Sequence, residues 1–247
     1  MNVHFVLHEV FERPGAYEAW VRARGHEASN TRVYEGDRLP ETADRIALLV
    51  VMGGPQSPAA TREECPHFDA VAEQSIISKC VAGGKAVVGV CLGAQLVGEA
   101  LGAAFSPSPE TEIGRFPISL TEAGSAHPNF SHFGSALPVG HWHHDMPGLT
   151  PDATIIATSA GCPRQIVAYG ELVYGFQCHM EFTPDVVELL VAASGQELAW
   201  SKDRHFVQQP DVLLAQDWTA MNETLFEFLD KLAAAYEARQ VVRTEAA

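Results

Sequence analysis

A cysteine flanked by glycines is the clearest chemical feature of the sequence. Cys91 follows the apolar run 86–90, lies between Gly89 and Gly93, and precedes a helical pattern. This is the layout of a nucleophile elbow, with Cys in place of Ser. Glycines remove Cβ atoms that the sharp turn would crowd, and the helix N-terminus stabilises a thiolate. The pattern predicts a nucleophile, although G-x-C-x-G alone would also fit a buried structural cysteine.

A histidine and a glutamate two residues apart supply the second signal. A thiolate that attacks an amide needs a base that later protonates the leaving amine. The apolar segment 173–178 is followed by His179-Met-Glu181. In an extended chain these two side chains project to the same side, so Glu181 can orient the His179 ring. Taken alone, a sheet-edge histidine beside a solvated glutamate is an equal explanation, and the elbow favours the catalytic one.

A Gly-Gly turn gives a third, weaker signal. Gly53-Gly54-Pro55 follows the apolar run 46–52, which places it at the carboxyl edge of a parallel sheet, where open α/β folds bind ligands. Its N–H groups, and that of Leu92 at the start of the helix, are candidate donors to an oxyanion. An ordinary tight turn explains the same residues.

These three motifs, in this order, resemble those of the class I glutamine amidotransferases with a Cys–His–Glu triad. The likeness runs from about 46 to 181 and is greatest to free-standing members described as GMP-synthase-like. Two further segments are similar to that subgroup's E-I-G-x-x-P and W-H-G-D motifs: Glu112-Ile-Gly-Arg-Phe-Pro-Ile and Trp142-His-His-Asp145.

The resemblance implies a role for each matching residue. Cys91 would be the nucleophile, His179 the base and acid, and Glu181 the group that orients it. The backbone N–H groups of Gly54 and Leu92 would form the oxyanion hole. The residues implied to bind the glutamine substrate are Gly53, Pro55, Gln95, His143 and Asp145. No metal and no organic cofactor is expected.

The sequence departs from the family pattern at three positions. The family usually has His-Pro-Glu, where this chain has Met180 in the middle. Cys178 replaces a common Phe and is expected to point away from the site. His144 replaces a Gly, which changes the local turn and the shape of the pocket.

The segment 141–145 contains three histidines, so we consider whether it forms a metal-binding site. His141, His143, His144 and Asp145 are suitable ligand types. Metal sites, however, draw ligands from separate fixed elements, and no Cys/His pair elsewhere complements this run. We therefore expect a structural or pocket-lining role here.

Composition restricts the possible partners. The 247 residues carry a formal net charge of −15 and are 47% hydrophobic, which is globular and argues against nucleic-acid and anionic-lipid surfaces. The longest apolar run, 46–52, is too short to cross a membrane. The first residues lack a secretory signal pattern, and five cysteines, an odd number, indicate free thiols. These features predict a cytoplasmic protein and identify no partner; the resemblance implies a small-molecule substrate, glutamine or a γ-glutamyl compound.

Apolar strands that alternate with helices predict an α/β fold. We expect an open, mainly parallel sheet flanked by helices, which the resemblance implies is a flavodoxin-like, three-layer amidotransferase domain with a small antiparallel hairpin region. The expected strands are 3–7, 46–52, 86–90, 117–120, 154–158, 165–169 and 172–177. The expected helices are 15–24, 66–81 and 92–101. The remainder of 106–148 is predicted to be long loops.

One domain is predicted over 1–247, with a helical C-terminal extension at about 184–240. Its apolar stripe within 213–235 is expected to be core: Leu214, Trp218, Met221, Leu225, Phe228 and Leu232. Residues 239–247 are expected to fray.

Three functions remain open from sequence. The first is hydrolysis of the glutamine side-chain amide through a Cys91 thioester, with ammonia released or passed to a separate synthetase, since the chain has no P-loop. The second is a γ-glutamyl peptidase or hydrolase acting on γ-glutamyl compounds. The third is a non-catalytic regulatory or binding module that keeps the fold.

Overall fold

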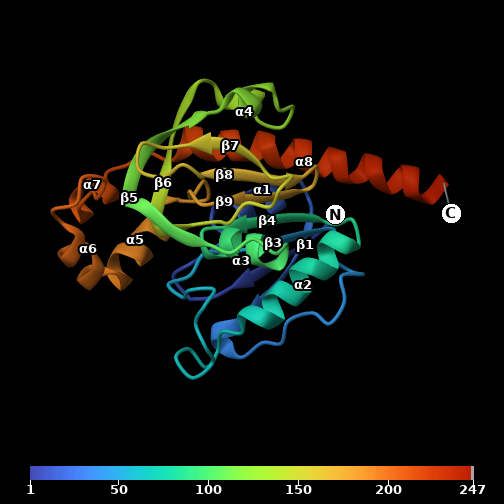
Figure 1. The fold of residues 1–247 in the computed structure, drawn as a ribbon, viewed down its shortest axis with the longest axis horizontal. Coiled ribbons are helices and arrows are strands. Elements are labelled where there is room, and N and C mark those ends of the chain that lie inside the picture. The colour runs from blue at the N-terminus through green and yellow to red at the C-terminus, as the bar shows by residue number, and fades with distance from the viewer. Residues whose placement is uncertain (246–247) are drawn as a thin grey trace.

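An open, nine-stranded sheet runs through the computed structural model, which describes residues 1–245 (Figure 1). The strand order is β2-β1-β3-β4-β9-β8-β7-β5-β6. Five neighbouring strands pair in parallel: β2 (Glu27–Arg32), β1 (Asn2–Leu7), β3 (Leu48–Val51), β4 (Ala86–Val90) and β9 (Val173–Phe176). Four more pair antiparallel: β8 (Ile166–Gly170), β7 (Thr154–Thr158), β5 (Ser106–Leu120) and β6 (Ala136–Met146).

The central parallel strands are buried on both faces. Every residue of β3 and β4 is buried, as continuous apolar runs in a parallel sheet require. Edge strand β2, with the sequence EASNTR, is exposed except at Thr31. It was not predicted because it has no apolar pattern.

Helices cover both faces of the sheet and complete three layers. Helices α1 (Ala16–Ala23) and α8 (Thr219–Glu245) contact one another on one face. Helices α2 (Ala70–Ala82) and α3 (Leu92–Ala100) do the same on the other face. The apolar residues form two clusters, one on each side of the sheet. The predicted open α/β sheet between helices is confirmed.

The prediction of long loops across 106–148 is wrong. Strands β5 and β6 form a long antiparallel ribbon there, with a bulge between Pro107 and Glu112. Strand β5 pairs with β7 only through Ser119 and Leu120; the rest of that side is paired with no other strand, although Ile113 bonds to the backbone of Phe206 and Gln208. Proline is tolerated at such edges, which explains how a proline-containing polar segment forms strands. A short helix and a 3₁₀ turn lie between them: α4 (Glu122–Ala126) and η2 (Ser131–Phe133).

The chain is helical after the last strand, as predicted. Three short helices precede α8: α5 (Pro184–Ala193), α6 (Gly195–Ser201) and α7 (Pro210–Leu214). The predicted stripe is buried from Trp218 to Leu232. Leu214 is the exception: it is 50% exposed, because α7 ends there and α8 begins at Thr219. Helix α8 continues to Glu245, so fraying from 239 is wrong for the described residues, and 246–247 lie outside them.

No helix within residues 1–245 is both long enough and apolar enough to cross a membrane.

Candidate active site

Cys91 lies at a sharp turn between β4 and α3. It has φ 51°, the only positive φ at a non-glycine position in the described chain. Such backbone costs of order 1–3 kcal/mol and persists where surrounding structure enforces it. The Cys91 N–H donates to the Phe176 carbonyl at 2.7 Å. A Cβ on Gly89 would overlap the backbone of Gly93, and one on Gly93 would overlap that of Val51. The two glycines are therefore required by close backbone approach.

His179 and Glu181 form a buried pair just after β9. His179 Nδ1 donates to Glu181 Oε1 at 2.6 Å, and both side chains are 1% exposed. Burial alone would lower the His179 pKa, but the Glu181 carboxylate and the neighbouring Cys91 raise the pKa well above its ordinary value. The site therefore favours an imidazolium. Phe182 stacks on the His179 ring at 4.5 Å and limits its rotation.

Cys91 and His179 meet across Gly53. A Cβ placed on Gly53 would lie 3.3 Å from His179 Cε1 and 3.4 Å from Cys91 Cβ, so glycine lets these groups converge. The Cys91 thiol donates to the Trp142 carbonyl at 3.6 Å. His179 Nε2 has no hydrogen-bond partner in the described part of the chain. Because Nδ1 is bonded to Glu181, Nε2 is the nitrogen available to the Cys91 thiol, and Cys91 contributes to the raised pKa of the ring.

Backbone amides at two element ends border the same space. Gly54 and Leu92 both line the pocket beside Cys91. Leu92 is the first residue of α3, so its N–H has no partner within the helix. His8 Nδ1 donates to the Gly53 carbonyl at 2.9 Å. Because the peptide is planar and trans, this bond turns the Gly54 N–H away from His8.

His8 is a site residue that sequence reasoning missed. Its Nε2 contacts Glu73 Oε2 at 2.8 Å, while Nδ1 faces the Gly53 carbonyl. Both nitrogens face acceptors, which favours the imidazolium form of His8. Burial opposes this charge, but Glu73 raises the pKa of His8 overall. No local motif marks His8, because its partners lie 45 and 65 residues away in sequence.

The predicted substrate-binding residues surround one pocket of about 430 Å³. Pro55, Gln95, His143 and Asp145 line it together with Cys91, Gly54 and Leu92. Gly53 lies behind this wall, next to the triad. Gln95 donates from Nε2 to Gln177 Oε1 at 3.2 Å, which fixes its amide. Cys178 bonds instead to the Gln165 carbonyl at 3.8 Å, away from the pocket.

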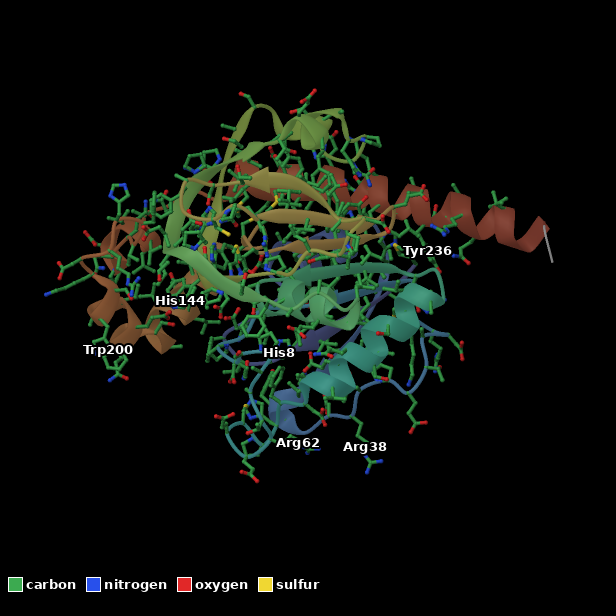
Figure 2. The ribbon with its side chains drawn as sticks, in the orientation of Figure 1. His8, Arg38, Arg62, His144, Trp200 and Tyr236 are labelled. Atoms are coloured by element: carbon green, nitrogen blue, oxygen red, sulfur yellow. The ribbon has the colours of Figure 1, made fainter. Side chains whose placement is uncertain are left out.

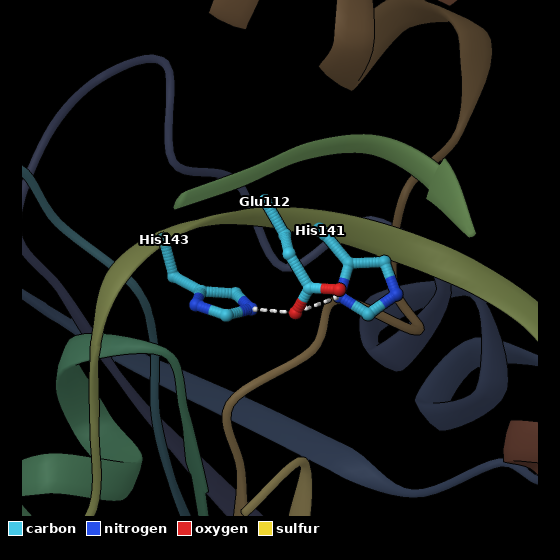
Figure 3. A group of neighbouring side chains, drawn as sticks. All are labelled: Glu112, His141 and His143. Atoms are coloured by element: carbon cyan, nitrogen blue, oxygen red, sulfur yellow. Dashed lines mark ion pairs between the residues drawn. The ribbon is translucent and has the colours of Figure 1, made fainter. Parts of the chain in front are cut away.

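A buried polar network lies behind His143 (Figure 3). Glu112 Oε2 lies 3.3 Å from His143 Nε2 and 3.8 Å from His141 Nδ1. It also accepts from Gln165 Nε2 at 2.6 Å and Ser159 Oγ at 2.7 Å. Burial lowers the pKa of His143, and that of His141 to about 3. Both rings are therefore neutral at pH 7. Glu112 was noted in sequence only as part of a motif, and its position behind the pocket was not predicted.

Two histidines and a glutamate are a known ligand set for zinc, and these three ligand atoms lie within 4.8 Å of one another. The fit is nevertheless poor. The Gln165 amide nitrogen lies 2.6 Å from the Glu112 oxygen and 3.1 Å from His143 Nε2. It therefore competes with a metal for Glu112 Oε2 and His143 Nε2, although Glu112 Oε1 and His141 Nδ1 have no hydrogen-bond partner among the described residues. We interpret the cluster as a hydrogen-bond network that holds the His143 ring.

His144, which departs from the family's Gly, joins the ribbon to the C-terminal helices. Its Nε2 donates to Glu197 Oε1 at 2.6 Å, and Trp142 Nε1 donates to Glu197 Oε2 at 2.9 Å. Glu197 belongs to α6. Its pKa is lowered: burial raises it, but the bonds to His144 and Trp142 outweigh burial. The two bonds to Glu197 hold α6 beside the pocket. Trp200 projects from this helix into solvent (Figure 2).

Glu12 is a second missed residue. It lines the pocket, and its Oε2 lies 2.9 Å from the position that a Gly53 Cβ would take. Burial raises its pKa to about 7, although His179 opposes this rise. Glu12 comes from the loop after β1, where the sequence shows no motif.

Comparison with known proteins identifies the family. The family model described as glutamine amidotransferase class-I matches residues 16–190. The chain belongs to the class I glutamine amidotransferase family. It is 56% identical over 239 residues to the glutamine amidotransferase-like protein YfeJ of Salmonella typhimurium, covering 97% of this chain and all of that protein.

Two solved structures share the fold, and one further protein matches part of the sequence. The crystal structure of SMU.1228c superposes with a TM-score of 0.92 at 49% identity, covering 94% of this chain and 99% of that one. A glutamine amidotransferase from Thermotoga maritima matches in fold, with a TM-score of 0.83 at 24% identity over 94% and 98% of the two chains. A 146-residue stretch is 30% identical to the GMP synthase (glutamine-hydrolyzing) of Aeropyrum pernix, covering 59% of this chain and 26% of that protein.

Proposed function

We propose that the protein hydrolyses the side-chain amide of glutamine, or of a γ-glutamyl compound, through a thioester on Cys91. The observation that carries the proposal is the meeting of Cys91 and His179 across Gly53, with Glu181 bonded to the far side of the imidazole. Membership of the class I family supports the same chemistry.

The proposed reaction has two steps. The Cys91 thiolate attacks the γ-carbonyl carbon, and the oxyanion accepts hydrogen bonds from the N–H groups of Gly54 and Leu92. His179 donates its proton to the departing nitrogen, the C–N bond breaks, and a γ-glutamyl thioester remains. Water then attacks this carbonyl as His179 takes its proton, the C–S bond breaks, and glutamate is released with the Cys91 thiolate and the protonated His179 restored.

An electrophilic glutamine analogue tests this proposal. A chloroketone analogue should alkylate Cys91 Sγ with loss of chloride, and mass spectrometry should find one adduct per chain. The Cys91→Ala variant should lose the adduct and at least about 10⁴-fold of the hydrolytic rate. Cys65→Ala is the matched control, because Cys65 is half-buried outside the pocket. Absence of an adduct and of turnover in folded wild type would favour the non-catalytic module.

A γ-glutamyl hydrolase is the second candidate, and the pocket favours it. Its volume of about 430 Å³ suits ligands larger than glutamine. Parallel assays of glutamate release from glutamine and from γ-glutamyl compounds separate the two. This chain matches only 26% of the Aeropyrum pernix GMP synthase, so an amidotransferase that passes ammonia to a separate synthetase is a form of the first candidate. If the protein is such an amidotransferase, kcat/KM for glutamine should exceed that for the γ-glutamyl compounds.

A further inference from the structure

A buried carboxylate with no role in the proposed reaction lies behind the proposed oxyanion hole. Glu73 belongs to α2, and its Oε2 lies 2.8 Å from His8 Nε2. The Glu73 side chain is 1% exposed, and that of His8 is fully buried. The other ring nitrogen of His8 donates to the Gly53 carbonyl at 2.9 Å. Glu73, His8 and the Gly53–Gly54 peptide therefore form one chain of contacts that starts on a helix and ends at the pocket.

Stability alone explains this buried pair poorly. Burying two charges has a desolvation cost that their attraction often fails to offset. Glu73 Oε1 has no hydrogen-bond partner among residues 1–245, so the carboxylate is only partly compensated. An apolar pair of similar volume would fill the same space without that cost. The arrangement is better explained by what its charge does to the neighbouring peptide.

The surroundings of His8 favour its protonated form. Burial opposes a charge there, but the Glu73 carboxylate raises the pKa of His8 overall, and the bond to the Gly53 carbonyl and the charge of Glu12 add to this rise. Glu73 lies in the first turn of α2, where the helix dipole favours a negative charge. Phe68 packs against the His8 ring at 5.7 Å and adds no charge. These surroundings favour an imidazolium paired with a carboxylate, with the positive end toward Gly53.

The Gly53–Gly54 peptide connects this charge to the pocket. Its carbonyl accepts from His8, and its N–H is one of the two proposed donors to the oxyanion. Resonance within the planar peptide links its two ends, and a charged donor strengthens and polarises the hydrogen bonds in its chain. A Cβ on Gly54 would lie 2.9 Å from His8 Cβ, so glycine permits this close approach. A protonated His8 therefore makes the Gly54 N–H a stronger donor than a neutral His8 would.

The stronger donor acts on the reaction rather than on substrate binding. The substrate oxygen becomes an oxyanion only in the tetrahedral intermediate, so the donor stabilises the transition state more than the bound amide. Because Glu73 and His8 are buried, little solvent screens their charges. The expected signature is a change in kcat with little change in KM.

We infer that Glu73 is a positioning residue that holds His8 as an imidazolium, which orients and polarises the Gly53–Gly54 peptide as an oxyanion donor. The inference rests on the proposed function and adds a second histidine–glutamate pair to it. Neither member of this second pair exchanges a proton with the substrate. The triad performs the proton transfers, whereas Glu73 and His8 act through the peptide that binds the oxyanion.

Glu73→Gln tests the role of the charge. Glutamine keeps the size of the side chain and can donate to His8 Nε2, so the bond from His8 to Gly53 is retained while the ion pair is lost. We expect kcat to fall about tenfold, which is less than the loss of a whole oxyanion donor, and KM to stay within about threefold. His8 should also lose its proton at lower pH in this variant, so the rate should decline at lower pH than in wild type. Glutamate release between pH 6 and 9 provides the measurement.

Two control variants separate the charge from the fold. Glu188→Gln makes the same substitution at an exposed position on α5, and Ile76→Val removes a buried methylene group from α2. Neither residue lines the pocket, so neither change should alter kcat or its pH dependence by more than about twofold. Circular dichroism verifies that each variant folds. If Glu73 only stabilised α2, Ile76→Val would lower kcat as Glu73→Gln does.

Alkylation of Cys91 by iodoacetamide gives a readout that involves no oxyanion. The sulfur displaces iodide from a CH₂ group, so the rate reports the thiolate, and peptide mapping separates Cys91 from the other cysteines. In Glu73→Gln this rate should stay within about threefold of wild type.

Two further measurements place the effect on His8. Once His8 is replaced in His8→Gln, adding Glu73→Gln should change kcat by less than about twofold, because the two residues act as a unit. The ¹⁵N resonances of the His8 ring, assigned by their absence in His8→Gln, should show two protonated nitrogens in wild type at pH 7.

The outcomes separate this inference from the proposed function. Wild-type kcat in Glu73→Gln, additive losses in the double variant, or a neutral His8 ring at pH 7 would each overturn the inference and leave hydrolysis at Cys91 intact. Alkylation that slows in parallel with turnover would also overturn it, because Glu73 would then support the nucleophile. If wild type releases no glutamate and forms no adduct with the glutamine analogue, the proposed function fails and the inference fails with it.

Discussion

The buried Glu181 carboxylate favours the protonated form of the neighbouring His179 ring. Removing the Glu181 charge removes a main cause of the raised His179 pKa. We expect Glu181→Gln to lower that pKa and to reduce kcat/KM for γ-glutamyl substrates by about 10²–10⁴-fold. A pH–rate profile of the variant against wild type measures both effects.

The same pair makes stability depend on pH. The folded pKa of His179 lies above the unfolded value of about 6.5, so protonation stabilises the folded state. This contribution is complete below about pH 6.5 and is lost as pH rises through the folded pKa. In Glu181→Gln the loss should shift to lower pH, as urea unfolding from pH 6 to 9 will measure. Glu188→Gln should match wild type, and an unshifted rate profile in Glu181→Gln would contradict the assigned role.

Ends of strands and helices, rather than their middles, carry the candidate site. His8 follows β1, Gly53 follows β3, Cys91 follows β4 and His179 follows β9. These strands are parallel neighbours, so their carboxyl ends meet at one edge of the sheet. His8 joins two of these ends and a helix, through Gly53 and Glu73.

We expect His8→Ala to release the Gly53–Gly54 peptide and lower kcat by about 10²-fold, with a smaller change in KM. His8→Gln, which keeps a donor for the Gly53 carbonyl, should recover part of the rate. His4→Ala is the matched control on β1, since His4 bonds to Ser29 and Thr31 at the outer side. Steady-state kinetics, with circular dichroism to verify folding, provide the test. Equal losses of kcat in the two alanine variants would contradict a specific role for His8.

Sequence predicted those elements whose patterns are local. Strands β3 and β4 were found because each is a continuous apolar run, and Cys91 was found because the elbow needs glycine at fixed offsets. Strand β2 and the β5–β6 ribbon were missed, because their residues are polar or proline-containing and only pairing with distant segments makes them strands. His8 and Glu12 were missed for the same reason: their partners are far along the chain, and no spacing marks them.

Helix α8 links the core of the molecule to the site. Its Phe228 ring lies 5.0 Å from those of Phe130 and Phe176 and 5.2 Å from that of Tyr174. Six residues earlier in α8, Asn222 donates to the carbonyls of Met180 and Phe182. The loop that carries His179 and Glu181 is thus held by the same helix that closes one face of the sheet.

Because the core and the site share α8, unfolding tests whether residues 1–247 behave as one domain. We expect Phe228→Ala to lower the free energy of unfolding by about 3–5 kcal/mol, and Leu214→Ala, at a half-exposed position, to change it by less than about 0.5 kcal/mol. Far-ultraviolet circular dichroism and indole fluorescence should report one coincident transition in urea for both variants. Separate transitions would mean that the C-terminal helices unfold apart from the sheet, in which case the Phe228 contacts would be confined to a unit smaller than the predicted domain.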